Sequence, residues 1–430
     1  MFLPFKLYDQ YYEFANAILW PFLHHVSPPT PTGGDVAAYF EVNTNLVAAC
    51  RSLYEELSVE GSAPPVVWVH DYHLFPLPLL LRAVLPESTR IGFFLHTPWP
   101  ALPLVQRLPF SRGFELVRGM LAADEATFHC HQYRIHFLEA AKFLGYKVSA
   151  STCVGKSGDV CEAKVFPIGI DPLPFLSAMD SPSTLGRYNN LKGFFKGVRV
   201  VVSVARLDPI KGLEQGLLAF GDFLEVVKAR TPPDNVLPCF ISVVVPSRET
   251  VPAYVALKKR VDGLASSINA KYGGLGRPPP ISVLYRSISH GELCSLLALG
   301  DACMIPSLRD GLNLVASEYI AVQEGVRIKG MRVPGALILS DFTGAASSLS
   351  GSLLVNPHDR VSVVAALEAA LFSMQPVETE SRHSRNASFV LHNTSEYWAK
   401  RCLEGLSQQE WTGTTTTATT TTTTGDSGGR

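Results

Sequence analysis

The chain has 430 residues, of which 47% are apolar and 17% charged, so it is long enough for two or three domains with large cores. Its formal net charge of −1 argues against a nucleic acid or a membrane surface bound through bulk electrostatics. No apolar run is long enough to span a bilayer, and no signal peptide opens the chain.

The N-terminal stretch, residues 1–60, is rich in aromatic side chains and mostly helical in pattern. Tyr11 and Trp20 lie in its most crowded segment, for which plain core packing is the simplest explanation. A loop rich in Pro and Gly follows at 26–34, and an amphipathic helix is predicted over 37–57.

Two short apolar strands are predicted next, and each ends in polar residues. The first, 66–69, runs into His70-Asp71-Tyr72-His73, and the second, 91–95, runs into His96-Thr97-Pro98. Helices are predicted over 77–85, 114–121 and 133–144, so strands and helices alternate as in a parallel doubly wound sheet. Such sheets bind ligands at the carboxyl ends of their strands, where these histidines lie.

The second half repeats this alternation. Strands are predicted at 198–204, 239–245, 281–285, 302–305 and 336–339, with helices between them. We therefore predict an α/β protein with an N-terminal domain at 1–171 and a second parallel domain at 172–389. The polar stretch from 172 to Gly193 is a linker candidate. Residues 390–408 are amphipathic and expected to pack back on the first domain, and 409–430 form a disordered Thr-rich tail.

A strand, a tight turn and a helix start are expected from Ser307 to Tyr319. Asp310-Gly311 forms the turn, and the free amides of Asn313 and Leu314 open a helix whose N-terminus favours an anion such as a phosphate. Glu318 lies one turn further on, where it can accept hydrogen bonds from a sugar, as can Asp310. These features outline a nucleotide-sugar site, although a surface loop with a helix cap explains the stretch equally well.

Basic residues follow two other predicted strands. Arg206 and Lys211 lie five residues apart before Gly212, and two cations beside a helix start can hold a diphosphate. A solvated basic turn is the alternative. Arg248 follows another strand and could take a phosphate, but alone this signal is weak.

The histidines near the first strands do not predict a metal site. His70 and His73 lack helical spacing, and no Cys or Glu stands beside them at zinc spacing. The eight cysteines are scattered without such spacing and are expected to be reduced thiols of a cytoplasmic protein. No Walker motif or Gly-x-Ser-x-Gly supports a phosphate-hydrolysing motor or a hydrolase.

Taken together, these stretches resemble the trehalose-6-phosphate synthases, the family-20 retaining glycosyltransferases, from about Tyr11 to Trp398. The segments that carry the resemblance are 16–21 (NAILWP), 67–74 (VWVHDYHL), 91–98 (IGFFLHTP), 166–171 (FPIGID), 206–212 (RLDPIKG), 245–248 (VPSR), 309–316 (RDGLNLVA) and 341–346 (DFTGAA). Eight segments in one order are far more specific than any one of them.

The resemblance implies two Rossmann-like domains facing across a cleft, the GT-B fold. It also implies a metal-free and cofactor-free transfer of glucose from UDP-glucose to glucose 6-phosphate with retention. It assigns roles in that reaction as follows: Arg206 and Lys211 hold the donor diphosphate with the amides of Asn313 and Leu314 at the Gly311 turn, Glu318 binds the ribose, Asp310 and His96 bind the donor glucose, Asp71 and Trp20 face the acceptor sugar, and Tyr11 and Arg248 take its 6-phosphate.

The chain departs from the family pattern at several points. The N-terminal strand and an Arg-bearing Gly-rich loop of the family are absent, so we expect a gap in the first sheet, low stability and little activity. Glu125-Ala126-Thr127 breaks an expected apolar run, and 324–334 resembles a loop insertion. Ala205 and Pro209 replace an acidic and an aromatic residue. The departures leave open a non-catalytic, regulatory synthase-like subunit and, less so, a glucosylglycerol-phosphate synthase. A homo-oligomer or a trehalose-synthase complex is the expected assembly.

Overall fold

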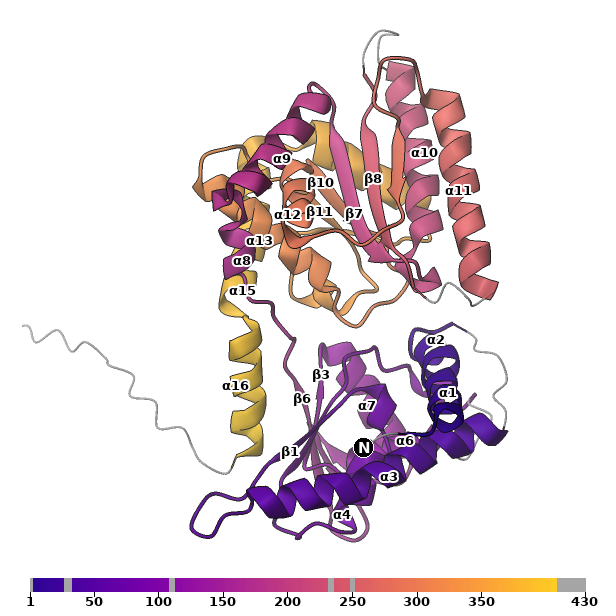
Figure 1. The fold of residues 1–430 in the computed structure, drawn as a ribbon, viewed down its shortest axis with the longest axis vertical. Coiled ribbons are helices and arrows are strands. Elements are labelled where there is room, and N and C mark those ends of the chain that lie inside the picture. The colour runs from indigo at the N-terminus through magenta and orange to yellow at the C-terminus, as the bar shows by residue number, and fades with distance from the viewer. Residues whose placement is uncertain (1–2, 27–32, 108–112, 231–235, 248–251, 408–430) are drawn as a thin grey trace, which may run out of the picture.

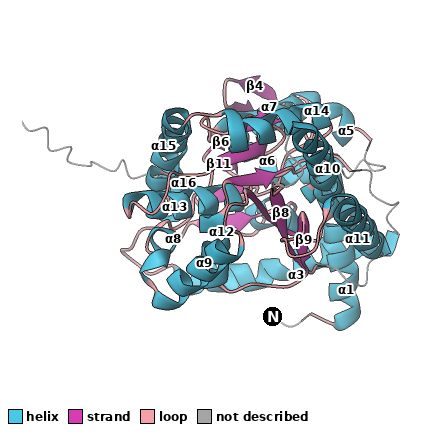
Figure 2. Ribbon diagram, turned by 90° about the horizontal axis from the view of Figure 1, so that it is seen from above, coloured by secondary structure: helices cyan, strands magenta, loops and turns pink. Residues whose placement is uncertain are grey.

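The computed structural model describes residues 3–26, 33–107, 113–230, 236–247 and 252–407 (Figure 1). Within these residues the strands form two separate six-stranded sheets. The longest axis of the molecule runs from one sheet to the other, and helices surround both (Figures 1 and 2). Arg248 and the Thr-rich tail, for which the sequence made predictions, lie outside the described residues.

The first sheet has the strand order β1-β2-β3-β6-β5-β4. The first four strands in this order pair in parallel, whereas β5 pairs antiparallel with both β6 and β4. Its strands are β1 (Val67–His70), β2 (Ile91–Phe94), β3 (Glu125–Phe128), β4 (Lys147–Ser149), β5 (Thr152–Val154) and β6 (Val160–Val165). Its helices are α1 (Phe5–Glu13), α2 (Trp20–Leu23), α3 (Gly33–Leu57), α4 (Leu77–Arg82), α5 (Leu102–Val105), α6 (Gly113–Leu121) and α7 (His131–Phe143).

The predicted gap in this sheet is wrong. Neighbouring strands are hydrogen-bonded throughout the order, and β1 lies at one edge with its register fixed by Val67 opposite Ile91. The strand that follows in the sheet, β2, is buried along its whole length. An edge strand leaves backbone groups unpaired on its outer side only, so the expected loss of several internal ladder bonds does not occur.

Residues 125–127, which break the apolar run expected before Phe128, nevertheless form β3. Glu125 is 3% exposed, and the amine of Lys164 on β6 lies 2.5 Å from its Oε2 atom. A buried carboxylate is tolerated when a cation pairs with it. The hydrophobic pattern missed this strand because its charge is neutralised by a residue 39 positions away.

The second sheet is parallel throughout, in the order β12-β11-β10-β7-β8-β9. Its strands are β7 (Val200–Arg206), β8 (Cys239–Val245), β9 (Ile281–Leu284), β10 (Ala302–Ile305), β11 (Ala336–Ser340) and β12 (Leu353–Val355). The helices of this half are α8 (Leu173–Leu176), α9 (Pro182–Phe194), α10 (Leu213–Arg230), α11 (Pro252–Tyr272), α12 (His290–Leu299), α13 (Leu314–Ile328), α14 (Arg360–Glu368) and α15 (Pro376–His392).

Both faces of this sheet are apolar because helices cover both. Along β7, Val200 and Val202 pack in the core beneath α12 and α13, whereas Val201 packs beneath α10 and α11. Figures 1 and 2 show these two helix pairs on opposite sides of the strands. Strands buried on both faces read as continuous apolar runs, which is why the sequence predicted β7, β8, β10 and β11 well.

Two further predictions about this half need correction. The linker candidate ending at Gly193 is largely helical, since it contains α8 and α9. The loop proposed at 324–334 is wrong for its first part, because α13 continues to Ile328, whereas residues 329–334 do form a turn and loop. Glu324 is buried there, where its carboxylate accepts hydrogen bonds from Arg327 and lies 2.9 Å from His383 Nε2. The charge of Glu324 therefore belongs to a packed ion pair and does not mark a loop.

The chain returns to the first sheet through its last described helix, α16 (Ser395–Leu406). The indole of Trp398 packs against Trp68 at 5.1 Å between ring centroids. Leu406 is 1% exposed and lies over Gly92, where a Cβ atom would come within 2.4 Å of it. Figure 1 shows α16 running beside the first sheet.

No single described helix is long and apolar enough to cross a membrane. One pair of consecutive helices, 360–373 and 376–392, has the length and composition of a span only when the two are taken together, and the chain bends by 117° between them. The eight cysteines are all free thiols.

Candidate functional site

The site is built around an ion pair at the carboxyl ends of β7 and β10. Lys211 Nζ lies 2.6 Å from Asp310 Oδ2. The same oxygen accepts hydrogen bonds from Asn313 Nδ2 at 2.9 Å and from Ser307 Oγ at 3.3 Å. The amide of Gly311 donates to Asp310 Oδ1 at 3.0 Å. The sequence predicted Lys211 and the Asp310 turn separately, and the fold brings them into contact.

The local charge balance keeps Asp310 ionised. Burial by itself would raise the pKa of this carboxyl, but the charge and the hydrogen bond of Lys211, together with His24 and the hydrogen bond from Asn313, outweigh burial and leave the pKa below its ordinary value. The side chains of Lys211 and Asp310 are 13% and 9% exposed, so the pair is largely shielded from water. Electrostatic interactions act strongly in such a place.

Arg206, the last residue of β7, is the more accessible cation. Its side chain is 44% exposed and lies 3.7 Å from Asp208 Oδ2. Its guanidinium lies 5.1 Å from the ring centroid of Trp20, which belongs to the first half of the chain. Gly212 allows the approach of Lys211, because its φ of 66° is left-handed and a Cβ atom would lie 1.8 Å from the Pro306 carbonyl oxygen.

The two halves of the molecule meet beside this ion pair. A Cβ atom on Gly311 would lie 2.0 Å from the carbonyl oxygen of His96, so only glycine permits this approach. The hydroxyl of Tyr133 on α7 donates to the Asp310 carbonyl at 2.7 Å. The strand ends of both sheets therefore face one another here, as the resemblance implied.

Asp71 and His96 form the first-half side of the site. Asp71 has a φ of 71°, a rare conformation for a residue with a side chain, and its Oδ1 accepts the backbone amide of His96 at 3.2 Å. Burial raises the pKa of Asp71 to about 6. Burial, together with neighbouring His70, lowers the pKa of His96 to about 4, so this imidazole is neutral at pH 7. His96 Nε2 lies 3.1 Å from His70 Nδ1.

Tyr11 and Trp20 belong to an aromatic wall on the same side. The Tyr11 hydroxyl donates to the His73 carbonyl at 3.3 Å, and its ring stacks on Tyr39 at 5.8 Å. Burial raises the pKa of Tyr11 to about 12. Trp20 packs on His24, with ring centroids 4.1 Å apart. Trp20 thus stands between the buried core and the guanidinium of Arg206.

The start of α13 contributes a carboxylate and backbone amides. Asn313 adopts a left-handed conformation with a φ of 71° and precedes Leu314, the first residue of the helix. Glu318 is mostly buried, and burial raises its pKa. No hydrogen-bond or ion-pair partner of Glu318 is found in the part of the chain that the structure describes. A ligand hydroxyl would satisfy this carboxylate.

Four residues of the site escaped sequence reasoning. His24 is 2% exposed, and burial lowers its pKa to about 3, while Asp310, Lys211 and Arg206 also influence that pKa. His25 Nδ1 lies 3.2 Å from a guanidinium nitrogen of Arg309. Arg309 is the third of these residues, and Tyr133, whose hydroxyl donates to the Asp310 carbonyl, is the fourth. The adjacent histidines at the end of the aromatic segment were the available signal, but the charged residues near them, among them Asp310, Lys211 and Arg309, lie in the other half of the chain.

Within the described ranges, no group of three or more His, Cys, Asp or Glu side chains is arranged to hold a metal ion.

Comparison with known proteins gives consistent relatives. The alpha,alpha-trehalose-phosphate synthase (UDP-forming) 2 of Aspergillus fumigatus is 38% identical over 95% of this chain and 82% of its own length. The probable synthase 2 of Arabidopsis thaliana is 37% identical over 91% of this chain but only 46% of its own length. The chain therefore spans about half of the plant protein and most of the fungal one.

Solved structures match equally well. An Escherichia coli structure, described as trehalose-6-phosphate bound with UDP-2-fluoro glucose, has a TM-score of 0.83 and 30% identity, covering 95% of this chain and 86% of that one. An alpha,alpha-trehalose-phosphate synthase (UDP-forming) from Burkholderia xenovorans in complex with glucose-6-phosphate has a TM-score of 0.82 and 30% identity, with coverages of 94% and 84%. The sequence profile of glycosyltransferase family 20 matches residues 1–408, and the chain accordingly belongs to that family.

Proposed function

We propose that the chain transfers glucose from UDP-glucose to glucose 6-phosphate with retention, giving α,α-trehalose 6-phosphate and UDP. The observation that carries the proposal is the Lys211–Asp310 ion pair. It lies where the strand ends of the two sheets face one another, and Arg206 flanks it. Family membership and the substrate-bearing related structures support it.

On the donor side, Arg206 and Lys211 neutralise the diphosphate that leaves as UDP. The amides of Asn313 and Leu314 add partial positive charge at the start of α13. Breaking the glycosidic bond builds negative charge on the leaving group, and cations held in a water-poor cleft stabilise that charge without reorganisation. Glu318, which lacks a protein partner in the described chain, accepts the ribose hydroxyls.

The donor glucose lies between Asp310 and His96. Because the pKa of His96 is depressed to about 4, its imidazole is neutral and hydrogen-bonds a sugar hydroxyl without adding positive charge. That neutrality matters, since the sugar itself becomes positively charged as UDP leaves.

The acceptor sugar lies against Asp71 and Trp20, with its 6-phosphate near Tyr11 and Arg248. Asp71 is fixed by the His96 amide and is ionised above about pH 6, so its carboxylate can orient the attacking hydroxyl. The attack comes from the face that UDP leaves, and a phosphate oxygen of the donor takes the proton. No protein nucleophile is needed in this scheme.

The test is turnover of UDP-glucose with glucose 6-phosphate by the 430-residue chain, followed as UDP release and as the disaccharide phosphate. Activity that survives a chelator is expected, because Arg206 and Lys211 supply the positive charge that a divalent ion would otherwise provide. Activity lost in chelator and restored by magnesium or manganese contradicts this expectation. Binding of both substrates without turnover would instead favour the regulatory synthase-like subunit.

Three finer proposals accompany this function. The first is that a strand and an Arg-bearing loop of the family are missing from this chain. Its turnover is compared with that of an upstream-extended chain to test this proposal.

The second is assembly as a homo-oligomer or within a trehalose-synthase complex, tested by light scattering. The third is a cytoplasmic location, supported by the eight free thiols and tested by cell fractionation.

A further inference from the structure

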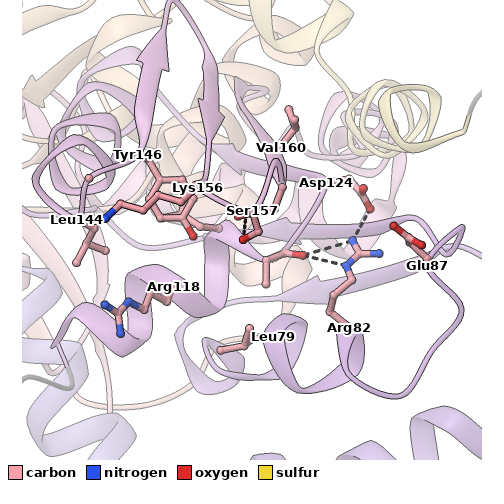
Figure 3. A pocket seen from close by; sticks show the side chains of 14 residues that line it. Leu79, Arg82, Glu87, Arg118, Asp124, Leu144, Tyr146, Lys156, Ser157 and Val160 are labelled. Carbon is pink, nitrogen blue, oxygen red and sulfur yellow. Dashed lines mark hydrogen bonds and ion pairs between the residues drawn. The ribbon is translucent and has the colours of Figure 1, made fainter.

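A second cavity lies in the first half of the molecule, away from the strand ends that form the proposed transfer site. It has a volume of about 680 Å³, within the range of small-molecule sites. Figure 3 shows its lining side chains, which come from α4, α6, the end of α7 and the turn between β5 and β6.

The position of this cavity relative to the cleft follows from β3. Asp124, which lines the cavity, precedes β3, whereas His129 follows the strand at its carboxyl end near His96. The cavity therefore lies at the amino ends of the parallel strands, and the proposed transfer site lies at their carboxyl ends. One bound molecule therefore cannot occupy both places.

One of the three cations in the lining is already used by the protein. Arg82 donates to the Thr89 carbonyl at 2.8 Å and to Asp124 Oδ2 at 2.9 Å, and it also bonds the Ala122 carbonyl. Its guanidinium is therefore a structural clamp between α4 and the start of β3. It is not available to a ligand.

The other two cations, Arg118 on α6 and Lys156 in the β5–β6 turn, have no ion-pair or hydrogen-bond partner in the described part of the chain. Figure 3 shows their nitrogen atoms extending to the side of the cavity that carries Leu144. Two unpaired cations at one end of a cavity favour an anion with more than one charge, such as a phosphate.

The remaining lining offers groups for hydroxyls. Asp159 is held in place by Ser157, whose hydroxyl donates to Asp159 Oδ1 at 2.9 Å. Burial and the hydrogen bond to Asp159 both raise the pKa of Tyr146, so this phenol is a stable donor and acceptor at neutral pH. Leu79 and Leu121 add apolar surface. Fixed carboxylate and phenol groups beside an apolar surface are suited to a sugar ring.

We propose that this cavity is a second binding site, for a small phosphorylated sugar. The phosphate lies between Arg118 and Lys156, and the hydroxyls meet Asp159 and Tyr146. The proposal is independent of the proposed glucosyl transfer, because none of these residues belongs to the cleft.

Calorimetric titration of the full chain with glucose 6-phosphate and, separately, with inorganic phosphate tests the proposal. Two classes of site are expected for glucose 6-phosphate, one in the cleft and one in the cavity. In the double variant Arg118→Gln, Lys156→Gln, the cavity class should weaken at least about tenfold while the cleft class and UDP affinity stay unchanged. The charge-preserving variant Arg118→Lys should keep most of the binding.

Lys147→Gln is the matched control, since Lys147 is exposed on β4 and does not line the cavity. Equal binding of glucose 6-phosphate by the wild type and the double variant overturns the proposal, whether the wild-type chain shows one class of site or two. Both replaced side chains are exposed, so the double variant should unfold at the wild-type temperature. If the double variant does not fold, the single charge reversal Lys156→Glu replaces it, and the same weakening of the cavity class is expected.

Discussion

At the scale of single residues, the Lys211–Asp310 pair joins stability to ligand binding. Lys211→Ala leaves a buried carboxylate without its cation, which should lower the free energy of unfolding by about 3–5 kcal/mol. UDP affinity should fall at least about tenfold, because one of the two cations at the diphosphate is lost. Denaturant unfolding and UDP titration measure the two effects separately.

A second substitution separates the two roles of Lys211. Asp310→Asn in the Lys211→Ala background removes the unpaired charge, so stability should partly recover while UDP affinity should not. Lys196→Ala, at an exposed position, is the control and should change neither quantity. Full recovery of UDP affinity in the double variant would show that Lys211 acts only through Asp310.

Asp71 predicts a pH dependence. Its pKa is raised from 3.8 to about 6, mainly by burial, so its ionised form is less favourable in the folded chain than in the unfolded chain. The stabilising contribution is present below about pH 4 and is lost as pH rises through 6, a decrease of about 2–3 kcal/mol. The free energy of unfolding of Asp71→Asn should lack this decrease.

Turnover should change with pH in the opposite direction to stability. The proposed reaction uses the carboxylate of Asp71, so kcat/KM should rise with pH through about 6 in the wild type. Asp71→Asn should lose most activity together with this limb of the profile. A wild-type profile that is flat between pH 5 and 7 would remove Asp71 from the acceptor role.

At the scale of elements, the turn between β10 and α13 decides how closely the two halves approach. Gly311→Ala places a methyl group where the His96 carbonyl oxygen lies 2.0 Å away, so the turn and the end of β2 must separate. We expect kcat to fall at least about a hundredfold, since a shift of about 1 Å in a reacting geometry costs that much. Steady-state kinetics measures the loss.

The matched control is Gly193→Ala in α9. A Cβ atom there meets nothing within 4 Å, and alanine is the better helix former by roughly 0.5–1 kcal/mol. Gly193→Ala should therefore be as active as the wild type and slightly more stable. Wild-type turnover in Gly311→Ala would mean that the contact between Gly311 and His96 is not needed for the reaction.

At the scale of the whole molecule, α16 ties the end of the described chain to its first sheet. Leu406 fills the space above Gly92, and Leu406→Ala should cost about 2–5 kcal/mol through the cavity that it leaves. Leu403→Ala in the same helix is the control, because Leu403 is 43% exposed and should cost less than about 1 kcal/mol.

Thermal unfolding followed by tryptophan fluorescence measures this difference, since Trp68 and Trp398 both report on the contact. Leu406→Ala should lower the unfolding temperature reported by these indoles more than that reported by α-helical circular dichroism of the whole chain. Equal effects of the two substitutions would show that α16 does not support the first sheet.

The sequence by itself determined the alternation of strands and helices in the second half, because strands buried on both faces must be apolar at every position. It also placed His70, Asp71, His96, Arg206 and Asp310 at or just after strand ends, since polar residues at the end of an apolar run are visible without any partner. These local patterns, with the order of the eight segments, were sufficient to indicate the family.

Only the tertiary structure decided the rest. The strand β3 depends on the pairing of Glu125 with Lys164, and the last turns of α13 depend on the pairing of Glu324 with His383. The contact of Tyr133 with the Asp310 carbonyl joins residues 177 positions apart. Each of these charges or hydroxyls looks solvent-exposed in the sequence, because the distant partner named here is set by how the elements pack and not by the order of residues in the chain.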